Sequence, residues 1–247
     1  MQLVQTDGVV LKSHNLAEAD RIIVIFTRHS GLIRGVAHGA RRLKSKFGGS
    51  LEPFTLIALS FLEKEGRDLV TLTSTYIKQS LFGLTYRQGL LSTFAYMANI
   101  LEKFAPPHEP NERLFRLLVA IAEALGNSEC DLDAIKRYFE IWLLKLSGFL
   151  PDLKHCFHCN LSLGSGDQIY QDPDLRFLCS SCSGGRGLRV PAKAFLLTRD
   201  ALNFPPAEFA MRFAEVDRNS RDDLTGLNKR YIERVLESDS GALRAAF

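Results

Sequence analysis

Long apolar runs are absent from this chain of 247 residues, although 46% of its residues are hydrophobic. No run of about 18 residues is apolar, and a membrane-spanning helix needs about 20 such residues. The first eight residues include Asp7 and show no basic segment followed by an apolar one, so we expect no signal peptide. The sequence therefore predicts a soluble, cytoplasmic protein with one large domain or two to three small ones.

The chain also lacks the short motifs of common catalytic sites. It contains no H-E-x-x-H, no G-x-S-x-G and no P-loop pattern. Its six histidines are scattered and its carboxylates are evenly spread, so the sequence nominates no acid–base pair. The glycine-rich stretches at residues 164–166 and 184–187 are typical of turns and not of phosphate-binding loops. We therefore expect a protein that is not an enzyme.

Cysteines are few, but four of the five form a regular pattern. Cys156 and Cys159 enclose two residues, Cys179 and Cys182 enclose two more, and 19 residues separate the two pairs. Two such turns can direct four thiolates at one tetrahedral Zn²⁺. Because four protein ligands leave no open position for water, the predicted zinc is structural and not catalytic.

These cysteines have other interpretations. They could form two disulfides, remain ordinary buried thiols, or hold a single redox metal, and nothing in the residues selects iron over zinc. A reducing compartment favours metal over disulfides. Cys130 has no partner by spacing and is expected to be an ordinary free thiol. His155 and His158 could each replace a cysteine ligand, but we expect them to be bystanders.

Acidic residues are absent from residues 21–51, which contain seven basic ones. Residues 1–80 hold 11 Lys and Arg against 7 Asp and Glu, a net charge of +4, whereas residues 81–247 hold 20 against 21, a net charge of −1. The basic residues of the stretch are Arg21, Arg28, Arg34, Arg41, Arg42, Lys44 and Lys46. Because Lys and Arg neutralise phosphates and release counterions, the stretch predicts a nucleic-acid surface. Phe47 could offer a stacking face to a base, although a single phenylalanine is more often part of the core. The alternative interpretation of the stretch is a solvated, charged hairpin.

The first 80 residues alternate short β-branched and aromatic runs with turn signals. The expected strands are residues 8–11, 21–26, 32–37, 55–62 and 68–77. Five short strands with no strong helix between them suggest a small barrel or sandwich. The OB-fold is the five-stranded barrel of this size that binds oligonucleotides.

The apolar spacing changes to three and four from residue 84. Helices are expected at residues 90–104, from Asn111 to Gly126, from Asp131 or Asp133 to Gly148, at 191–202 and at 224–236. Their apolar stripes are typical of a helix-on-helix core and not of a ligand groove. Residues 207–221 are ambiguous. The predicted fold is α+β and multi-domain, with the barrel in residues 1–80 and a helical domain in residues 81–247 that carries a zinc-binding insertion at about 150–190.

Several segments resemble the RecO family of bacterial recombination mediators and DNA-repair proteins. Residues 6–11 (TDGVVL) and 18–23 (EADRII) are similar to the family's first strands. Residues 35–42 (GVAHGARR) resemble its KGARR stretch, with His38 where a lysine is common, and the LEPF segment at 51–54 resembles its following strand. Residues 138–156 resemble the helix that runs into the zinc-binding cysteines. The resemblance covers nearly the whole chain and is loose at 203–222.

This resemblance implies an N-terminal OB domain, a central helical domain and a zinc loop. It implies binding of single- and double-stranded DNA, annealing of complementary strands, a partnership with RecR, contact with the C-terminal tail of single-stranded DNA-binding protein, and help in loading RecA. It also implies a place at the nucleoid during repair and no membrane partner. The zinc role falls on Cys156, Cys159, Cys179 and Cys182. The DNA role falls on Arg34, Arg41, Arg42, Lys44 and Lys46.

Two other classes of function stay open at this point. The first is an interaction scaffold stapled by zinc, whose basic face is incidental and which has no DNA affinity. The second is a zinc-dependent nucleic-acid enzyme such as a nuclease, which would need an open metal position or Mg²⁺ held by carboxylates.

Overall fold

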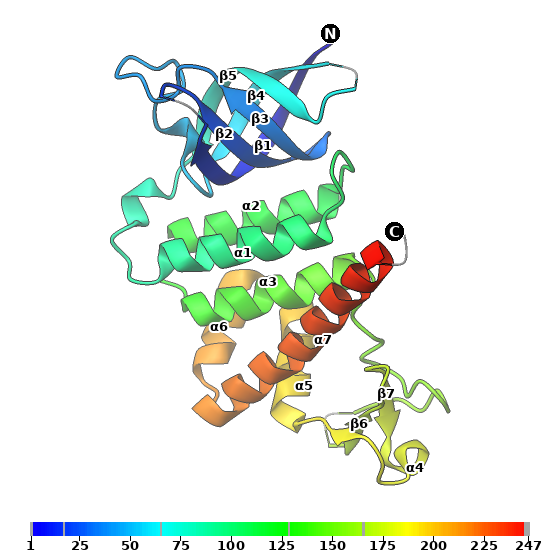
Figure 1. Cartoon of the computed structure of the whole chain (residues 1–247). Helices are drawn as coiled ribbons and strands as arrows, with labels where there is room; N and C mark the ends of the chain where they lie inside the picture. Colours follow the sequence, from blue (N-terminus) through cyan, green and yellow to red (C-terminus); the bar gives the residue numbers. More distant parts are fainter. Residues whose placement is uncertain (1, 17, 65, 128, 165, 245–247) are drawn as a thin grey trace. The chain divides into compact units, whose positions relative to one another are not determined.

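The computed structural model describes residues 2–16, 18–64, 66–127, 129–164 and 166–244 (Figure 1). The chain forms two compact units, Met1–Ser128 and Glu129–Phe247. Within the described ranges, no helix is long and apolar enough to cross a membrane. The predicted division of the chain into domains at residue 80 stays a prediction.

Five strands close a barrel at the start of the first unit (Figure 1). They are β1 (Gln2–Asn15), β2 (Arg21–Thr27), β3 (Gly31–Ala37), β4 (Leu56–Glu63) and β5 (Leu69–Gln79). Their order around the barrel is β1-β2-β3-β5-β4, and β4 pairs again with β1. The pairs are antiparallel except for β3 and β5, which run parallel. This OB-like barrel confirms the predicted fold class.

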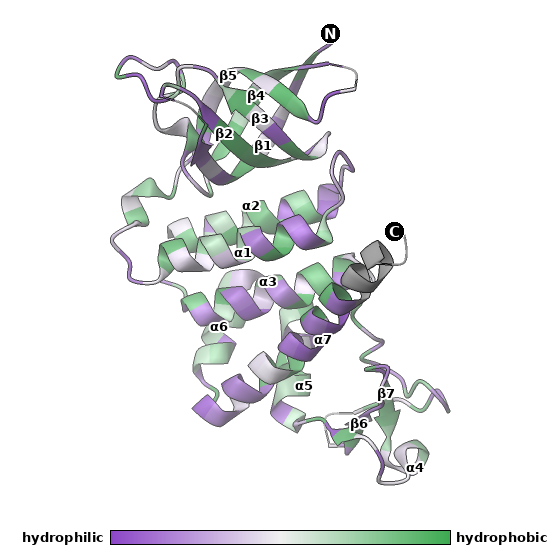
Figure 2. Ribbon diagram, viewed as in Figure 1, coloured by the Kyte–Doolittle hydropathy of each residue, from purple (hydrophilic) through white to green (hydrophobic). Residues whose placement is uncertain are grey.

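Side chains that alternate inward along the strands fill the barrel. In β4, buried and half-buried residues alternate, as expected for a strand with one face in the core. Figure 2 shows hydrophobic residues along the barrel strands. Phe47, which is 3% exposed, and Leu51 of the short 3₁₀ helix η1 (Gly48–Leu51) add to this core from the β3–β4 connection. Phe47 therefore offers no stacking face to a ligand.

Two helices complete the first unit after a short 3₁₀ turn, η2 (Phe82–Leu84). They are α1 (Leu90–Phe104) and α2 (Glu112–Asn127), and both contact β1. Asn111 caps α2 as predicted, because its Oδ1 accepts the Leu114 N–H at 3.0 Å. The helix runs to Asn127, so Gly126 lies in its last turn and does not end it.

Helices dominate the second unit. They are α3 (Leu132–Leu146), α5 (Ala192–Asn203), α6 (Pro206–Ala214) and α7 (Arg218–Arg244), and α3 packs against the other three. Asp131 is the N-cap of α3, accepting the Asp133 N–H at 2.8 Å. Gly148 follows the helix with φ +79°, a left-handed conformation that glycine adopts readily at this position. Figure 2 shows hydrophobic and hydrophilic residues mixed along α3 and α7.

The ambiguous region at 207–221 is helical, in α6 and the first turn of α7. Pro206 occupies the first position of α6, where its missing N–H costs no hydrogen bond, so it is suited to start this helix. Phe209 and Phe213 are fully buried and anchor α6. Asp217 caps α7 by accepting the Ser220 N–H at 3.0 Å. Because α6 has only nine residues and α7 begins four residues after it ends, the spacing of apolar residues is too short to reveal either helix start from the sequence.

A small sheet lies between α3 and α5, inside the predicted insertion. It consists of β6 (Ile169–Gln171), β7 (Phe177–Cys179) and β8 (Leu188–Arg189) in the order β7-β6-β8, with the short helix α4 (Ser180–Ser183) after β7. We call residues 150–190 the cysteine segment.

Candidate metal centre and candidate nucleic-acid surface

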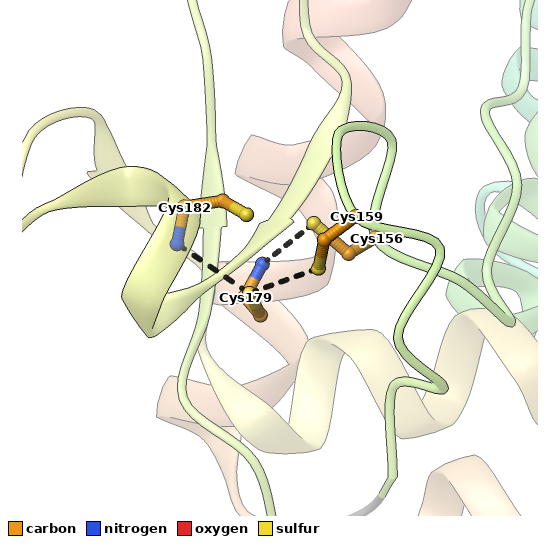
Figure 3. A group of neighbouring side chains, drawn as sticks. All are labelled: Cys156, Cys159, Cys179 and Cys182. Atoms are coloured by element: carbon orange, nitrogen blue, oxygen red, sulfur yellow. Dashed lines mark hydrogen bonds between the residues drawn. The ribbon is translucent and has the colours of Figure 1, made fainter.

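The four predicted cysteine ligands come together in the cysteine segment (Figure 3). Their sulfur atoms all lie within 4.8 Å of one another, and Cys159 Sγ is 3.7 Å from Cys179 Sγ. Zinc–sulfur bonds of about 2.3 Å in a tetrahedron separate the sulfurs by about 3.8 Å. A disulfide would need about 2.05 Å. None of the five cysteines forms a disulfide, so the disulfide interpretation is wrong and the spacing suits a metal.

Backbone hydrogen bonds shape the two cysteine turns. In the first turn, the Asn160 N–H donates to the Cys156 carbonyl at 2.9 Å, and Asn160 adopts φ +59°, which asparagine tolerates better than most residues. In the second, the Cys182 N–H donates to Cys179 Sγ at 3.5 Å. The Cys179 N–H reaches across to Cys156 Sγ at 3.4 Å and joins the two turns. Such N–H donors favour thiolates over thiols.

The acidities of two thiols move in opposite directions. The pKa of Cys156 is lowered to about 6: burial opposes this shift, but the backbone N–H groups of Cys159 and Cys179 donate to its sulfur and outweigh the burial. The pKa of Cys182 is raised to about 12 because Cys159 and Cys179 share hydrogen bonds with it, and burial adds to the effect. The Cys156 thiolate therefore forms readily, whereas deprotonation of Cys182 beside it is disfavoured. A divalent cation would stabilise the thiolate forms of all four cysteines.

The neighbouring histidines take other partners. His155 Nδ1 lies 2.9 Å from Asp152 Oδ2, and the His158 ring packs edge-on against Phe157 with the centroids 5.6 Å apart. In the described part of the chain, the cluster of possible ligands contains four sulfurs and neither imidazole. A four-sulfur set suits Zn²⁺ or iron, and it leaves no protein position open.

Aromatic contacts attach the cysteine segment to the helices of its own unit. The Phe177 ring lies 5.3 Å from Phe195 of α5 and 6.4 Å from Tyr231 of α7. The Tyr231 hydroxyl donates to the Leu175 carbonyl at 2.8 Å and accepts from Gln171 Nε2 at 2.7 Å. Burial raises the pKa of Tyr231, so the phenol stays protonated and can donate. The cluster of four cysteines is therefore attached to buried side chains of α5 and α7 through β6 and β7.

The basic loop, which we define as residues 38–47, connects β3 to η1 in the first unit. Asp20, just before β2, holds its first residues: Asp20 Oδ2 lies 2.7 Å from His38 Nδ1, and Oδ1 accepts the Gly39 N–H at 2.8 Å. The Arg41 N–H donates to the Ala19 carbonyl at 3.0 Å. The pKa of Asp20 is lowered, first by the Gly39 N–H and then by His38. The loop thus lies against the β1–β2 connection, one of the loops with which OB-folds bind oligonucleotides.

The cations of the basic loop face solvent. Arg41, Arg42, Lys44 and Lys46 are all exposed. Among the described residues, no carboxylate lies within ion-pair distance of Arg42, Lys44 or Lys46. Lys46 Nζ lies 5.1 Å from the centre of the Phe47 ring. Together these four exposed cations form a concentrated positive site on the basic loop.

Arg34 is in a different situation from the loop cations. It lies in β3, and its Nη2 is 3.4 Å from Glu102 Oε2 of α1, while Lys12 contacts the other oxygen of Glu102. Arg21 and Arg28 likewise have carboxylate partners, Glu52 at 3.4 Å and Glu112 at 3.1 Å. The absence of acids from residues 21–51 therefore does not leave every cation there unpaired. Four of the five predicted DNA-contacting residues share the loop, and Arg34 stands apart.

Comparison with known proteins gives a consistent result over both units. A family model described as "Recombination protein O N terminal" matches residues 1–81, and one described as "Recombination protein O C terminal" matches residues 90–244. The chain is 30% identical over 241 residues to a protein of Anaeromyxobacter sp. (strain K) named DNA repair protein RecO, covering 96% of this chain and 94% of that one. A protein of the same name from Geobacter metallireducens is 32% identical over 200 residues, covering 81% and 80%.

Proposed function

Because this chain belongs to the RecO family, we propose that it is a DNA-repair and recombination mediator that binds single- and double-stranded DNA and anneals complementary strands. The observation that carries this proposal is the basic loop, with four exposed cations on an OB-like barrel. Such a surface can neutralise two phosphate backbones while leaving the base edges free to pair. Annealing needs both properties and no covalent chemistry.

We infer the partners from the family in the same way. The proposed partners are RecR and the C-terminal tail of single-stranded DNA-binding protein, with a functional link to RecA loading. The proposed cofactor is a structural Zn²⁺ held by the four cysteines, whose sulfur spacing supports it. Zinc would supply folding energy to the cysteine segment and no catalysis, since its four ligands complete the coordination.

Equilibrium binding of a labelled single strand at several salt concentrations tests the DNA role. If the four loop cations each neutralise one phosphate, the log–log slope is about −2.8, and affinity falls about 50-fold between 50 and 200 mM salt. We exclude Arg34 from this count because its Glu102 ion pair would have to break first. Arg41→Ala with Arg42→Ala should reduce the slope to about −1.4 and the fall to about sevenfold.

The matched control removes the same charge from the second unit. Lys229→Ala with Arg234→Ala deletes two exposed cations of α7 and should leave the slope unchanged. A double mutant of the loop that keeps the full slope would show that DNA binds elsewhere. Absence of DNA binding at low salt would favour a zinc-stapled scaffold. Cleavage of labelled DNA that requires a divalent cation would instead favour a nuclease.

A further inference from the structure

The basic loop also carries one large apolar side chain that lies entirely in solvent. Leu43 is 103% exposed, whereas Tyr86, the next most exposed large hydrophobic residue in the described part of the chain, is 79% exposed. Two arginines precede Leu43 and two lysines follow it within three residues. A single exposed leucine is ordinary on most surfaces. Here the surrounding cations restrict what can cover it, because the occupant must present both negative charge and apolar surface.

The loop presents Leu43 from a defined backbone. The Arg42 N–H donates to the Gly39 carbonyl at 3.1 Å, and the Ser45 N–H donates to the Arg42 carbonyl at 3.0 Å. The backbone at Leu43 is therefore part of two successive hydrogen-bonded turns. Asp20 anchors the loop on one side, and the buried Phe47 anchors it on the other. Because the backbone around Leu43 is already ordered, covering the leucine costs little backbone conformational freedom.

We propose that Leu43 is an apolar wedge that packs against an unstacked base, so that the basic loop binds a duplex with an unpaired base more tightly than a continuous duplex. This inference rests on the proposed DNA binding and adds a preference for one kind of DNA. Apolar side chains, leucine among them, insert between base steps in several DNA-binding proteins. The flanking cations would hold the phosphates on either side of such a step.

The preference follows from the cost of unstacking. In a continuous duplex, opening a base step consumes free energy of the same order as that gained by burying a leucine. Where a base is already unpaired, most of that cost is absent, and the burial of Leu43 appears as added affinity. Partly paired duplexes arise whenever two strands anneal, so a wedge would keep the loop on the intermediates of the proposed reaction.

The test compares two duplexes of about 20 base pairs that differ only by one unpaired adenine in the middle of one strand. The full chain should bind the interrupted duplex about tenfold more tightly, which corresponds to about 1.4 kcal/mol. Leu43→Asn, which keeps the size but not the apolar character, should bring this ratio to within about twofold of one. Leu43→Met should retain it. Single-strand affinity and its salt slope should change by less than about twofold in both variants, since every cation remains.

Each other result would overturn the wedge. A ratio near one in the wild type, or a ratio that survives in Leu43→Asn, contradicts it while leaving DNA binding intact. No binding to any DNA would remove the proposed function together with the wedge. Binding to vesicles with about 30% anionic lipid that is lost in Leu43→Asn would assign the leucine to a membrane surface. The same loss with an acidic peptide that ends in an apolar residue would assign it to a protein partner.

Discussion

Glu140 is a buried acidic residue that joins two helices of the second unit. It lies in α3 and is fully buried, and its Oε2 accepts from Arg137 Nη1 at 2.9 Å and from Asn228 Nδ2 of α7 at 2.9 Å. Replacing Glu140 by Leu would remove the buried partner of the Arg137 guanidinium, whose side chain is only 9% exposed, and would leave it the half-exposed Asp133 at 3.3 Å. Breaking a buried pair in this way costs about 3–5 kcal/mol. For a unit of this size, the melting temperature should fall by roughly 12–20 °C.

Removing both charges should be less harmful than removing one. In Arg137→Met with Glu140→Leu, no buried charge remains, and the main loss is the acceptor of the Asn228 amide, worth about 1–2 kcal/mol. Trp142, the only tryptophan of the chain, donates to the Ala201 carbonyl at 2.8 Å within the second unit. Its fluorescence during guanidinium unfolding therefore reports on the unfolding of this unit. The reasoning would be refuted if the double mutant lost as much free energy of unfolding as the single mutants Arg137→Met and Glu140→Leu lose in sum. A cost of Glu140→Leu below about 1 kcal/mol would refute it as well.

Three further predictions concern the cysteine segment and the basic loop. Chelation of the proposed zinc should expose residues 150–190 to limited proteolysis first, because the two cysteine turns then lose the cation that would join them; first cuts in residues 1–80 would contradict this. Tyr231→Phe deletes two hydrogen bonds and should destabilise the second unit by about 1–2 kcal/mol while metal content stays the same, and loss of metal would show that the contact supports the cluster itself. The pKa of Asp20 is lowered, so its contacts are complete above the ordinary value of 3.8 and are lost as the pH falls through the pKa of the folded state. The Gly39 amide resonance should therefore titrate with a midpoint below pH 3.8. A midpoint at or above 3.8 would mean that Asp20 does not hold the loop.

Features set by neighbouring residues were predictable from the sequence. The alternation of β4 reveals its buried face, and Asn111 and Asp131 identify two helix starts because capping is a contact over two or three residues. The cysteine spacing predicts the cluster since each turn needs only two intervening residues. These signals are short-range, and the chain supplies them locally.

Features set by distant residues were not predictable. Arg34 and its partner Glu102 are 68 residues apart in sequence, so charge counting along residues 21–51 treated a paired arginine like the loop cations. Pro206 does not identify the start of α6 from the sequence alone, because a proline can interrupt a helix or begin one. The exposure of Leu43 also needed the structure, since a leucine beside Phe47 could equally have joined the barrel core.

The most direct test of the account is annealing of two complementary oligonucleotides by the pure protein, without nucleotide or Mg²⁺, at low and raised salt. The account predicts an acceleration that weakens as salt rises and falls further in the Arg41→Ala, Arg42→Ala variant, with its melting temperature close to that of the wild type. Acceleration that is unaffected by the double substitution would place annealing away from the basic loop. Absence of acceleration at low salt would contradict the proposed mediator function.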